Sequence, residues 1–259
     1  MTLTRSWNVL ERRLPSIVQV LLIAAFLTLI EYVGQARLIS RTTMVPFTEM
    51  VATLWQLVTD GEVLPNVFRT VIEALGSFVL AMSVGIPLGF LFWRFSGLGK
   101  VMEPYLVSMY AMPTVMFYPA LLILFGLGPV PIICIAVVAA IVPVILNTTL
   151  GLAQMPEVYF KVARTAGASP WQTFSKVMAP AASPFIFTGL RISAIYSLTV
   201  TIGMEFILSD QGLGYAVRIF YEFFSTGEMY AYIMLNLTIA VALNFFLFRG
   251  EAAMRRERV

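Results

Sequence analysis

Long apolar segments with almost no charge alternate with short polar segments along most of this chain. Six of them have about 20 or more mostly apolar residues, the length that an α-helix needs to cross the hydrocarbon core of a bilayer. They cover residues 15–36, 69–93, 104–125, 129–152, 182–206 and 229–248. The short alternating segments of a membrane β-barrel are missing. Because backbone groups in lipid must pair internally, the pattern predicts an all-α integral membrane protein with six transmembrane helices.

A different pattern separates the first two predicted spans. Within residues 37–68, apolar side chains recur at helical spacing, which predicts a short external amphipathic helix on the membrane or against the bundle. These side chains are Phe47, Met50, Val51, Leu54, Trp55 and Val58. The chain should therefore divide into 1–66 with the first span and this segment, 67–249 with the core spans, and a basic tail over 250–259.

Composition supports a chain whose main solvent is lipid. Apolar residues make up 59% of the 259 positions and charged residues 12%, against about 45–50% and about 25% in soluble domains. The N-terminal apolar run from Ile17 to Ile30 leads into Glu31-Tyr32-Val33 without a small-residue cleavage site. We therefore interpret it as a retained first span and not as a signal peptide.

The distribution of Lys and Arg predicts the orientation of the spans. With the N-terminus inside, twelve basic residues fall on the cytoplasmic side and four outside, and Arg191 lies within the fifth span. The inside set is Arg5, Arg12, Arg13, Arg94, Lys100, Lys161, Arg164, Lys176, Arg249, Arg255, Arg256 and Arg258, and the outside set is Arg37, Arg41, Arg69 and Arg218. This positive-inside bias predicts that both termini are cytoplasmic.

The chemistry available to the chain is narrow. It has no histidine and one cysteine, Cys134, and it contains neither a nucleophile triad nor a phosphate-binding loop ending in Gly-Lys-Ser/Thr. We therefore expect no enzymatic activity and no ATP binding in this chain. The third and fourth spans have no ionisable side chain between Glu103 and Glu157, which argues against a proton relay. A secondary transporter or channel remains the alternative to an ATP-driven system.

Three acidic residues lie in the predicted spans. Glu31 and Glu73 can snorkel to the outer interface or pair with Arg37 or Arg69. Glu205 follows a small, polar stretch, and a helix face of that kind either packs tightly or lines an aqueous path. The candidate lining residues of a substrate path are Tyr110, Met116, Asn147, Ser197, Thr201 and Glu205. Lipid contact or helix packing is the competing interpretation of the aromatic face around Tyr110.

Glycine and proline interrupt several spans. Gly85-Ile-Pro-Leu-Gly89 is a G-x-x-x-G pattern, which permits close helix contact and which a pore lining would also explain. Each proline inside a span removes a helix hydrogen bond and can introduce a kink. These prolines are Pro87, Pro113, Pro119 and Pro143.

The longest polar stretch on the predicted cytoplasmic side covers 153–181. Its pattern predicts two helical pieces separated near Gly167, with Ser169 as the N-cap and Pro170 as the first residue of the second helix. This helix–turn–helix loop is the largest inside loop and the one best suited to docking a partner.

This loop resembles the EAA loop of binding-protein-dependent ABC importer permeases. Residues 161–169 read Lys-Val-Ala-Arg-Thr-Ala-Gly-Ala-Ser, and Gly167 and Pro180 have the family's separation. Lys161 and Val162 stand where Glu and Ala are usual, and Ala179 stands for Leu, which puts a family salt bridge in doubt. The residues that the resemblance assigns to ATPase coupling are Lys161, Ala163, Arg164, Thr165, Ala166, Gly167, Ala168, Ser169 and Pro170.

The resemblance extends over about 60–249 and is strongest to the nitrate/sulfonate/taurine branch. It rests on Pro87-Leu88-Gly89, the stretch from Pro104 to Pro119, Leu124–Gly128, Pro143–Thr148, Gly189–Ile192 and Gly212–Tyr215. It implies a type I ABC importer permease fold with cytoplasmic coupling helices, in a bacterial inner membrane.

The resemblance also implies partners. These are a second copy of the chain, two ABC ATPase subunits that hold ATP and Mg²⁺, a periplasmic or lipid-anchored binding protein, and membrane lipid. No nucleic acid and no cofactor of this chain are expected. The substrates implied are a nitrate-, sulfonate- or taurine-like anion, or alternatively a thiamine precursor, riboflavin or an aromatic acid.

Overall fold

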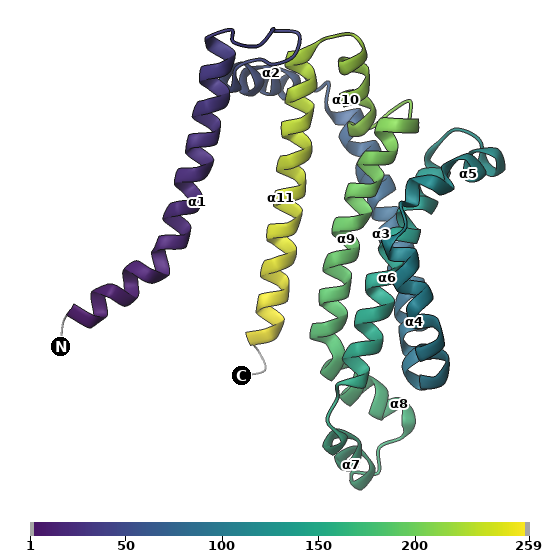
Figure 1. Cartoon of the computed structure of the whole chain (residues 1–259). Helices are drawn as coiled ribbons and strands as arrows, with labels where there is room; N and C mark the ends of the chain where they lie inside the picture. Colours follow the sequence, from purple (N-terminus) through teal and green to yellow (C-terminus); the bar gives the residue numbers. More distant parts are fainter. Residues whose placement is uncertain (1–2, 257–259) are drawn as a thin grey trace. The chain divides into compact units, whose positions relative to one another are not determined.

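The computed structural model describes residues 3–256, and it folds them into helices joined by short turns, without a strand in that range (Figure 1). The helices of the first half are α1 (Leu3–Gln35), α2 (Phe47–Thr59), α3 (Leu64–Arg94), α4 (Ser96–Ala111), the 3₁₀ turn η1 (Thr114–Phe117), α5 (Tyr118–Phe125) and α6 (Pro129–Ala153). The second half holds α7 (Glu157–Thr165), α8 (Pro170–Thr173), the π-helical turn η2 (Phe174–Met178), α9 (Ala179–Leu208), α10 (Leu213–Glu222) and α11 (Thr226–Arg256). Residues 257–259, the end of the predicted tail 250–259, lie outside the described residues.

The helices confirm an all-α fold with several potential membrane spans. Within the described residues, five helical segments are long and apolar enough to cross a bilayer, and a bent pair gives a sixth. These segments are Ile17–Gln35, Leu64–Arg94, the bent pair Ser96–Ala111 and Thr114–Phe125, Pro129–Ala153, Pro170–Glu222 and Thr226–Glu251.

The chain forms two compact units. The first comprises residues up to Glu62 together with 219–235. Here the predicted amphipathic helix is present as α2, and its first turn binds α1 because the Thr48 N–H and hydroxyl both donate to the Glu31 carboxylate, at 3.0 and 2.8 Å. The Gln35 amide also donates to the Glu31 carboxylate, so the partners of Glu31 are Thr48 and Gln35 and not Arg37. The Tyr230 hydroxyl donates to the Thr43 carbonyl at 3.0 Å, which connects α11 to the loop before α2.

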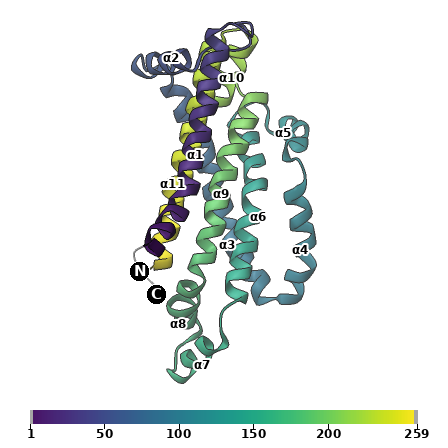
Figure 2. The same ribbon diagram turned by 60° about the vertical axis from the view of Figure 1, so that its left-hand side comes forward.

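The second unit comprises residues 63–218 and 236 onward, and its centre is formed by α3, α6 and α9. These three helices lie side by side in both views (Figures 1 and 2). Glycines bring them close together, since a Cβ added to Gly85 would lie 2.9 Å from Val144 Cβ, and one added to Gly189 would lie 2.8 Å from Asn147 Cβ. The G-x-x-x-G pattern of α3 therefore serves helix packing against α6.

This packing predicts that Gly89→Ala destabilises the bundle. A Cβ at Gly89 would lie 2.6 Å from Thr148 Cβ and 2.9 Å from the Ile145 carbonyl oxygen, so α3 and α6 must separate. Overpacking of this kind costs about 1–3 kcal/mol. Gly76→Ala on the same helix is the matched control, because its Cβ would meet Ile133 Cδ1 at an ordinary 3.6 Å. Thermal unfolding of both variants in detergent should lower the midpoint for Gly89→Ala only, and equal midpoints would contradict the packing.

The third predicted span, 104–125, differs from a continuous helix. The chain leaves α4 at Met112, where the backbone is extended with ψ 137°, and α4 meets the η1–α5 segment at 91°. Pro113 explains the break, because its ring excludes helical backbone at the preceding residue and it has no N–H to donate. The apolar run of this span was predicted from the sequence, but the bend between its two helical pieces was not.

A charged cluster in the second unit joins α9 to the C-terminal part of α11. The Arg191 guanidinium lies 2.9 Å from the Glu251 carboxylate and donates to the Asn244 amide oxygen at 3.0 Å, and the Thr188 hydroxyl donates to Glu251 at 2.9 Å. Arg191 therefore pairs inside the bundle, although a position within an apolar span also suggests snorkelling.

Candidate functional site

The turn after α7 is shaped by a C-terminal cap. The Ala168 N–H donates to the Ala163 carbonyl and the Gly167 N–H donates to the Arg164 carbonyl, each at 3.0 Å. This is the Schellman pattern, in which the residue after the C-cap takes a left-handed backbone. Gly167 has φ +66°, a conformation that costs glycine little and most other residues about 1–2 kcal/mol.

The second half of the turn has a complete N-terminal cap. The Gln172 N–H donates to Ser169 Oγ at 3.2 Å, and the Ser169 N–H donates to Gln172 Oε1 at 2.8 Å, with Pro170 at the first helical position. The predicted N-cap and first helical residue are confirmed. The partner Gln172 was not predicted, although the Ser-x-x-Gln spacing of a capping box is visible in the sequence.

Aromatic packing attaches this hairpin to the bundle. Phe174 of η2 meets Phe90 of α3 edge-on at 5.1 Å between ring centroids, and Phe160 of α7 stacks with Trp93 at 6.5 Å. Leu152 and Met178 are buried beneath these rings. Both arms of the hairpin are thus fixed to helices of the bundle, and in Figure 1 α7 and α8 extend beyond the ends of α6 and α9. Sequence reasoning placed the hairpin but missed these aromatic anchors.

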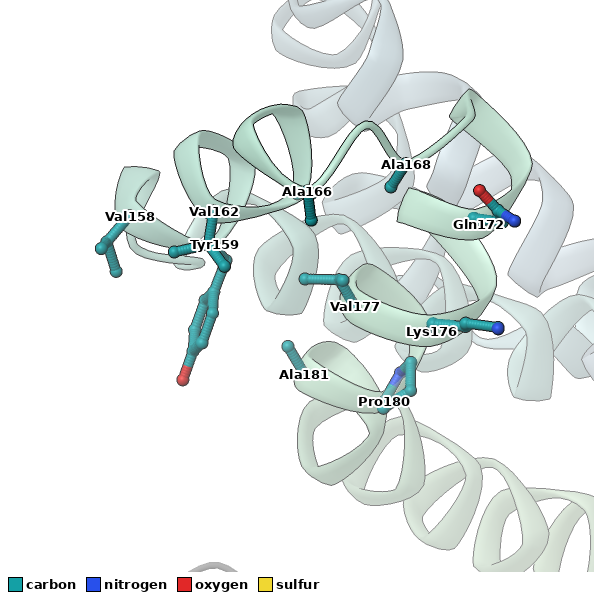
Figure 3. A pocket seen from close by; sticks show the side chains of 11 residues that line it. Val158, Tyr159, Val162, Ala166, Ala168, Gln172, Lys176, Val177, Pro180 and Ala181 are labelled. Atoms are coloured by element: carbon teal, nitrogen blue, oxygen red, sulfur yellow. The ribbon is translucent and has the colours of Figure 1, made fainter.

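A concavity of about 920 Å³ opens between the two arms of the hairpin (Figure 3). Its lining is mainly apolar, and Gln172 and Lys176 are the polar members. The lining residues are Val158, Tyr159, Val162, Ala163, Ala166, Ala168, Gln172, Lys176, Val177, Pro180 and Ala181. Val162 in the lining is 61% exposed, and Trp171 on α8, which precedes the lining residue Gln172 in the sequence, is 71% exposed. Exposed apolar side chains around a hollow of this size are typical of a surface that another protein covers.

The six candidate path residues do not form one site. Ser197, Thr201 and Glu205 lie on successive turns of α9 and are at most 1% exposed. The Asn147 amide donates to the Pro143 carbonyl of its own helix at 2.8 Å. Tyr110 packs on Tyr196, with ring centroids 5.1 Å apart, and Met116 on η1 is 69% exposed.

The buried stripe on α9 has an unusual polar composition. Ser193 begins the small, polar stretch of this span but was not among the predicted lining residues, and it extends the spacing of four residues one turn toward the hairpin. The hydroxyl groups of Ser193, Ser197 and Thr201 have no hydrogen-bond partner within the described residues. An unpaired buried hydroxyl costs free energy, so these side chains are poor choices for packing alone.

Glu205 closes the stripe at the end opposite the hairpin and caps α10 from a neighbouring helix. Its carboxylate accepts the Gly214 N–H at 2.9 Å and the Thr70 hydroxyl at 2.7 and 2.8 Å. Thr70 in turn accepts the Leu213 N–H at 2.9 Å. The first N–H groups of α10 are therefore satisfied by side chains of α9 and α3, and a carboxylate is favoured at a helix N-terminus. Glu73 pairs instead with Arg69, at 2.6 Å.

A hairpin anchored at one end of a close-packed bundle of long apolar helices is the arrangement of an integral membrane protein with a docking surface at one side. Residues 81–256 match the family described as "Binding-protein-dependent transport system inner membrane component", and the chain belongs to this family. The fold is that of a type I ABC importer permease. A chain of the MetNI methionine ABC transporter, in inward-facing conformations, superposes with a TM-score of 0.65 over 74% of this chain and 95% of that chain, at 18% identity.

The relatives include permeases whose names state different substrates and one whose name states none. A putative ABC transporter permease of Methanocaldococcus jannaschii is 29% identical over 70% of this chain and 64% of its own length. The riboflavin transport permease of Chloroflexus aurantiacus is 28% identical over 77% of each chain. A putative aliphatic sulfonates permease of Bacillus subtilis is 25% identical over 88% of this chain and 82% of its own length. The chain spans just under two thirds of the archaeal relative.

Proposed function

We propose that this chain forms the translocation path of an ATP-driven importer for a small solute, which an external binding protein delivers. A separate ATPase drives transport through the hairpin of residues 153–181. The observation that carries this proposal is the hairpin itself, because both its helices are capped at the turn and anchored by aromatic packing at the base. A segment held in this way transmits a push from a partner to α6 and α9 as a rigid body.

The proposed assembly contains two copies of the chain and two ATPase subunits, which hold ATP and Mg²⁺. The hairpin is placed in the cytoplasm together with both termini, since the basic residues favour that side. The coupling surface consists of Lys161 and residues 163–170, with Gly167 at the tip. The family match over residues 81–256 supports these partners.

The substrate is proposed to be a small anion or heterocycle selected mainly by the binding protein. The names of the relatives, which include riboflavin and aliphatic sulfonates, support this range. We place the path along the face of α9 that carries Ser197 and Thr201, because their unpaired hydroxyls can bind a polar solute when the bundle opens.

Removing these hydroxyls should change uptake and leave stability intact. Ser197→Ala and Thr201→Val delete groups that have no hydrogen-bond partner in the described part of the chain, so their removal leaves no donor or acceptor there unsatisfied. We expect an altered KM or maximal rate of uptake with a thermal midpoint that is unchanged or slightly raised. Ser108→Ala on the exposed side of α4 is the control. Unchanged uptake kinetics after alanine substitution at every candidate path residue would contradict the lining assignment.

Co-purification tests the proposed function as a whole. The chain, tagged and extracted from membranes in mild detergent, should retain an ATPase with a Gly-Lys-Ser/Thr phosphate-binding loop in stoichiometric amount. Mass spectrometry of the retained proteins identifies that subunit. A preparation that transports solute but holds no such ATPase would refute the proposal and would favour a secondary transporter or channel.

A further inference from the structure

The hairpin has an excess of positive charge at its exposed surface. Between Gln154 and Ala181 the sequence holds the basic residues Lys161, Arg164 and Lys176 and a single acidic residue, Glu157. Lys161 Nζ lies 3.6 Å from Glu157 Oε2, but their side chains are 76% and 87% exposed. A pair so exposed contributes little and leaves Lys161 free to engage a partner.

The concavity between the arms combines an apolar side with a cationic one. Figure 3 shows the polar ends of Gln172 and Lys176 pointing to the same side, away from Val158 and Tyr159. Val162 and Val177 belong to the apolar part of the lining. An occupant that fits this surface has an apolar side chain for the hollow and negative charge beside it.

We infer that the ATPase partner of this permease presents an apolar side chain to this concavity and carboxylate side chains to Lys161 and Lys176. This inference rests on the proposed function and specifies the chemistry of its docking surface. It also gives a role to Lys161, which differs from the glutamate that is usual at this position of the EAA loop. The position of the ATPase that faces Lys161 is then acidic. An ATPase that has a basic group there, which would suit a glutamate at position 161, would be repelled by Lys161.

Restoring the family's usual residue should therefore weaken the complex. We expect Lys161→Glu and Lys176→Glu each to lower the ATPase retained by the purified permease about fivefold or more, because like charges then face one another across the contact. The retained amount in the unaltered complex should fall as NaCl is raised. Lys100→Glu, an exposed lysine of α4 outside the hairpin, makes the same change of charge and should retain the ATPase normally.

A suppressor selection identifies the opposing groups. Uptake by the Lys161→Glu strain should be restored by changing an acidic residue of the ATPase to Lys or Arg. Val162→Ser should also weaken retention, and its 61% exposure means that the hairpin should fold without that valine.

The outcomes separate this inference from the proposed function. If the unaltered chain retains no ATPase, the proposed function fails. If it retains ATPase and Lys161→Glu binds as well or more tightly, only the charge assignment fails. Lys161→Glu could also retain the ATPase but lose binding to vesicles that contain anionic phospholipid. That result would assign the cationic surface to lipid and would likewise overturn the inference.

Discussion

Gly167→Asp is expected to uncouple ATP hydrolysis from uptake while the permease stays in the membrane with its partners. An added Cβ at Gly167 has no atom within 4 Å in the described chain, so the hairpin itself has room for the side chain. Aspartate also tolerates the left-handed backbone better than most residues. The effect should therefore arise at the partner's surface. Coupling between sites is typically about 1–3 kcal/mol, so its loss should lower uptake per ATP about 5- to 150-fold.

Proteoliposomes that contain the full complex provide the measurement. Solute taken up and phosphate released are counted in the same sample, for the unaltered chain and for two variants. Gly167→Asn is the matched control, because it has nearly the same size and the same tolerance of positive φ but no charge. Gly167→Asn should retain more coupling than Gly167→Asp if the ATPase surface is acidic. Normal uptake per ATP in Gly167→Asp would contradict the assignment of Lys161 and residues 163–170 to the coupling surface.

Glu205→Ala is expected to cause the largest loss of stability among single substitutions in the α3–α6–α9 bundle. It removes the acceptor of two buried donors, the Gly214 N–H and the Thr70 hydroxyl. Each buried group left unsatisfied costs about 1–3 kcal/mol, and the deleted side chain also leaves a cavity. The N-terminus of α10 should then separate from α9 before the rest of the bundle unfolds.

Asp210→Ala makes the same type of change at an exposed acidic residue five positions along the chain. Thermal unfolding in detergent should show a clearly lower midpoint for Glu205→Ala than for the unaltered chain. The midpoint of Asp210→Ala should be almost unchanged. Hydrogen exchange should rise first at Leu213 and Gly214 in Glu205→Ala. Equal midpoints for the two variants would show that the carboxylate does not hold α10.

The hairpin was the part of the site most open to prediction. Its signals are local, since Gly167, Ser169 and Pro170 act on the backbone within a few residues of themselves. The aromatic anchors were not predictable in the same way. Phe90 and Phe174 are far apart in sequence, and nothing in the local pattern distinguishes a ring that packs on another helix from one that faces lipid.

The end of the bundle opposite the hairpin shows the same limit. Thr70 and Glu205 are separated by 135 positions, and their contact depends on how α3 crosses α9. The pattern of Ser197, Thr201 and Glu205 on one face of a helix was visible, but such a face is compatible with burial or with an aqueous lining. The break at Pro113 could not be predicted from the proline alone, because Pro87 and Pro143 lie inside helices that continue through them.

Solute uptake into proteoliposomes tests the central claim, that this chain is the pore of an ATPase-coupled importer, most directly. The permease, its ATPase and its binding protein are reconstituted with ATP on the side of the hairpin and solute with binding protein on the other. Uptake should require ATP hydrolysis and the binding protein, and it should persist when proton and sodium gradients are abolished. Uptake by the permease alone, driven by an ion gradient and indifferent to ATP, would contradict the account.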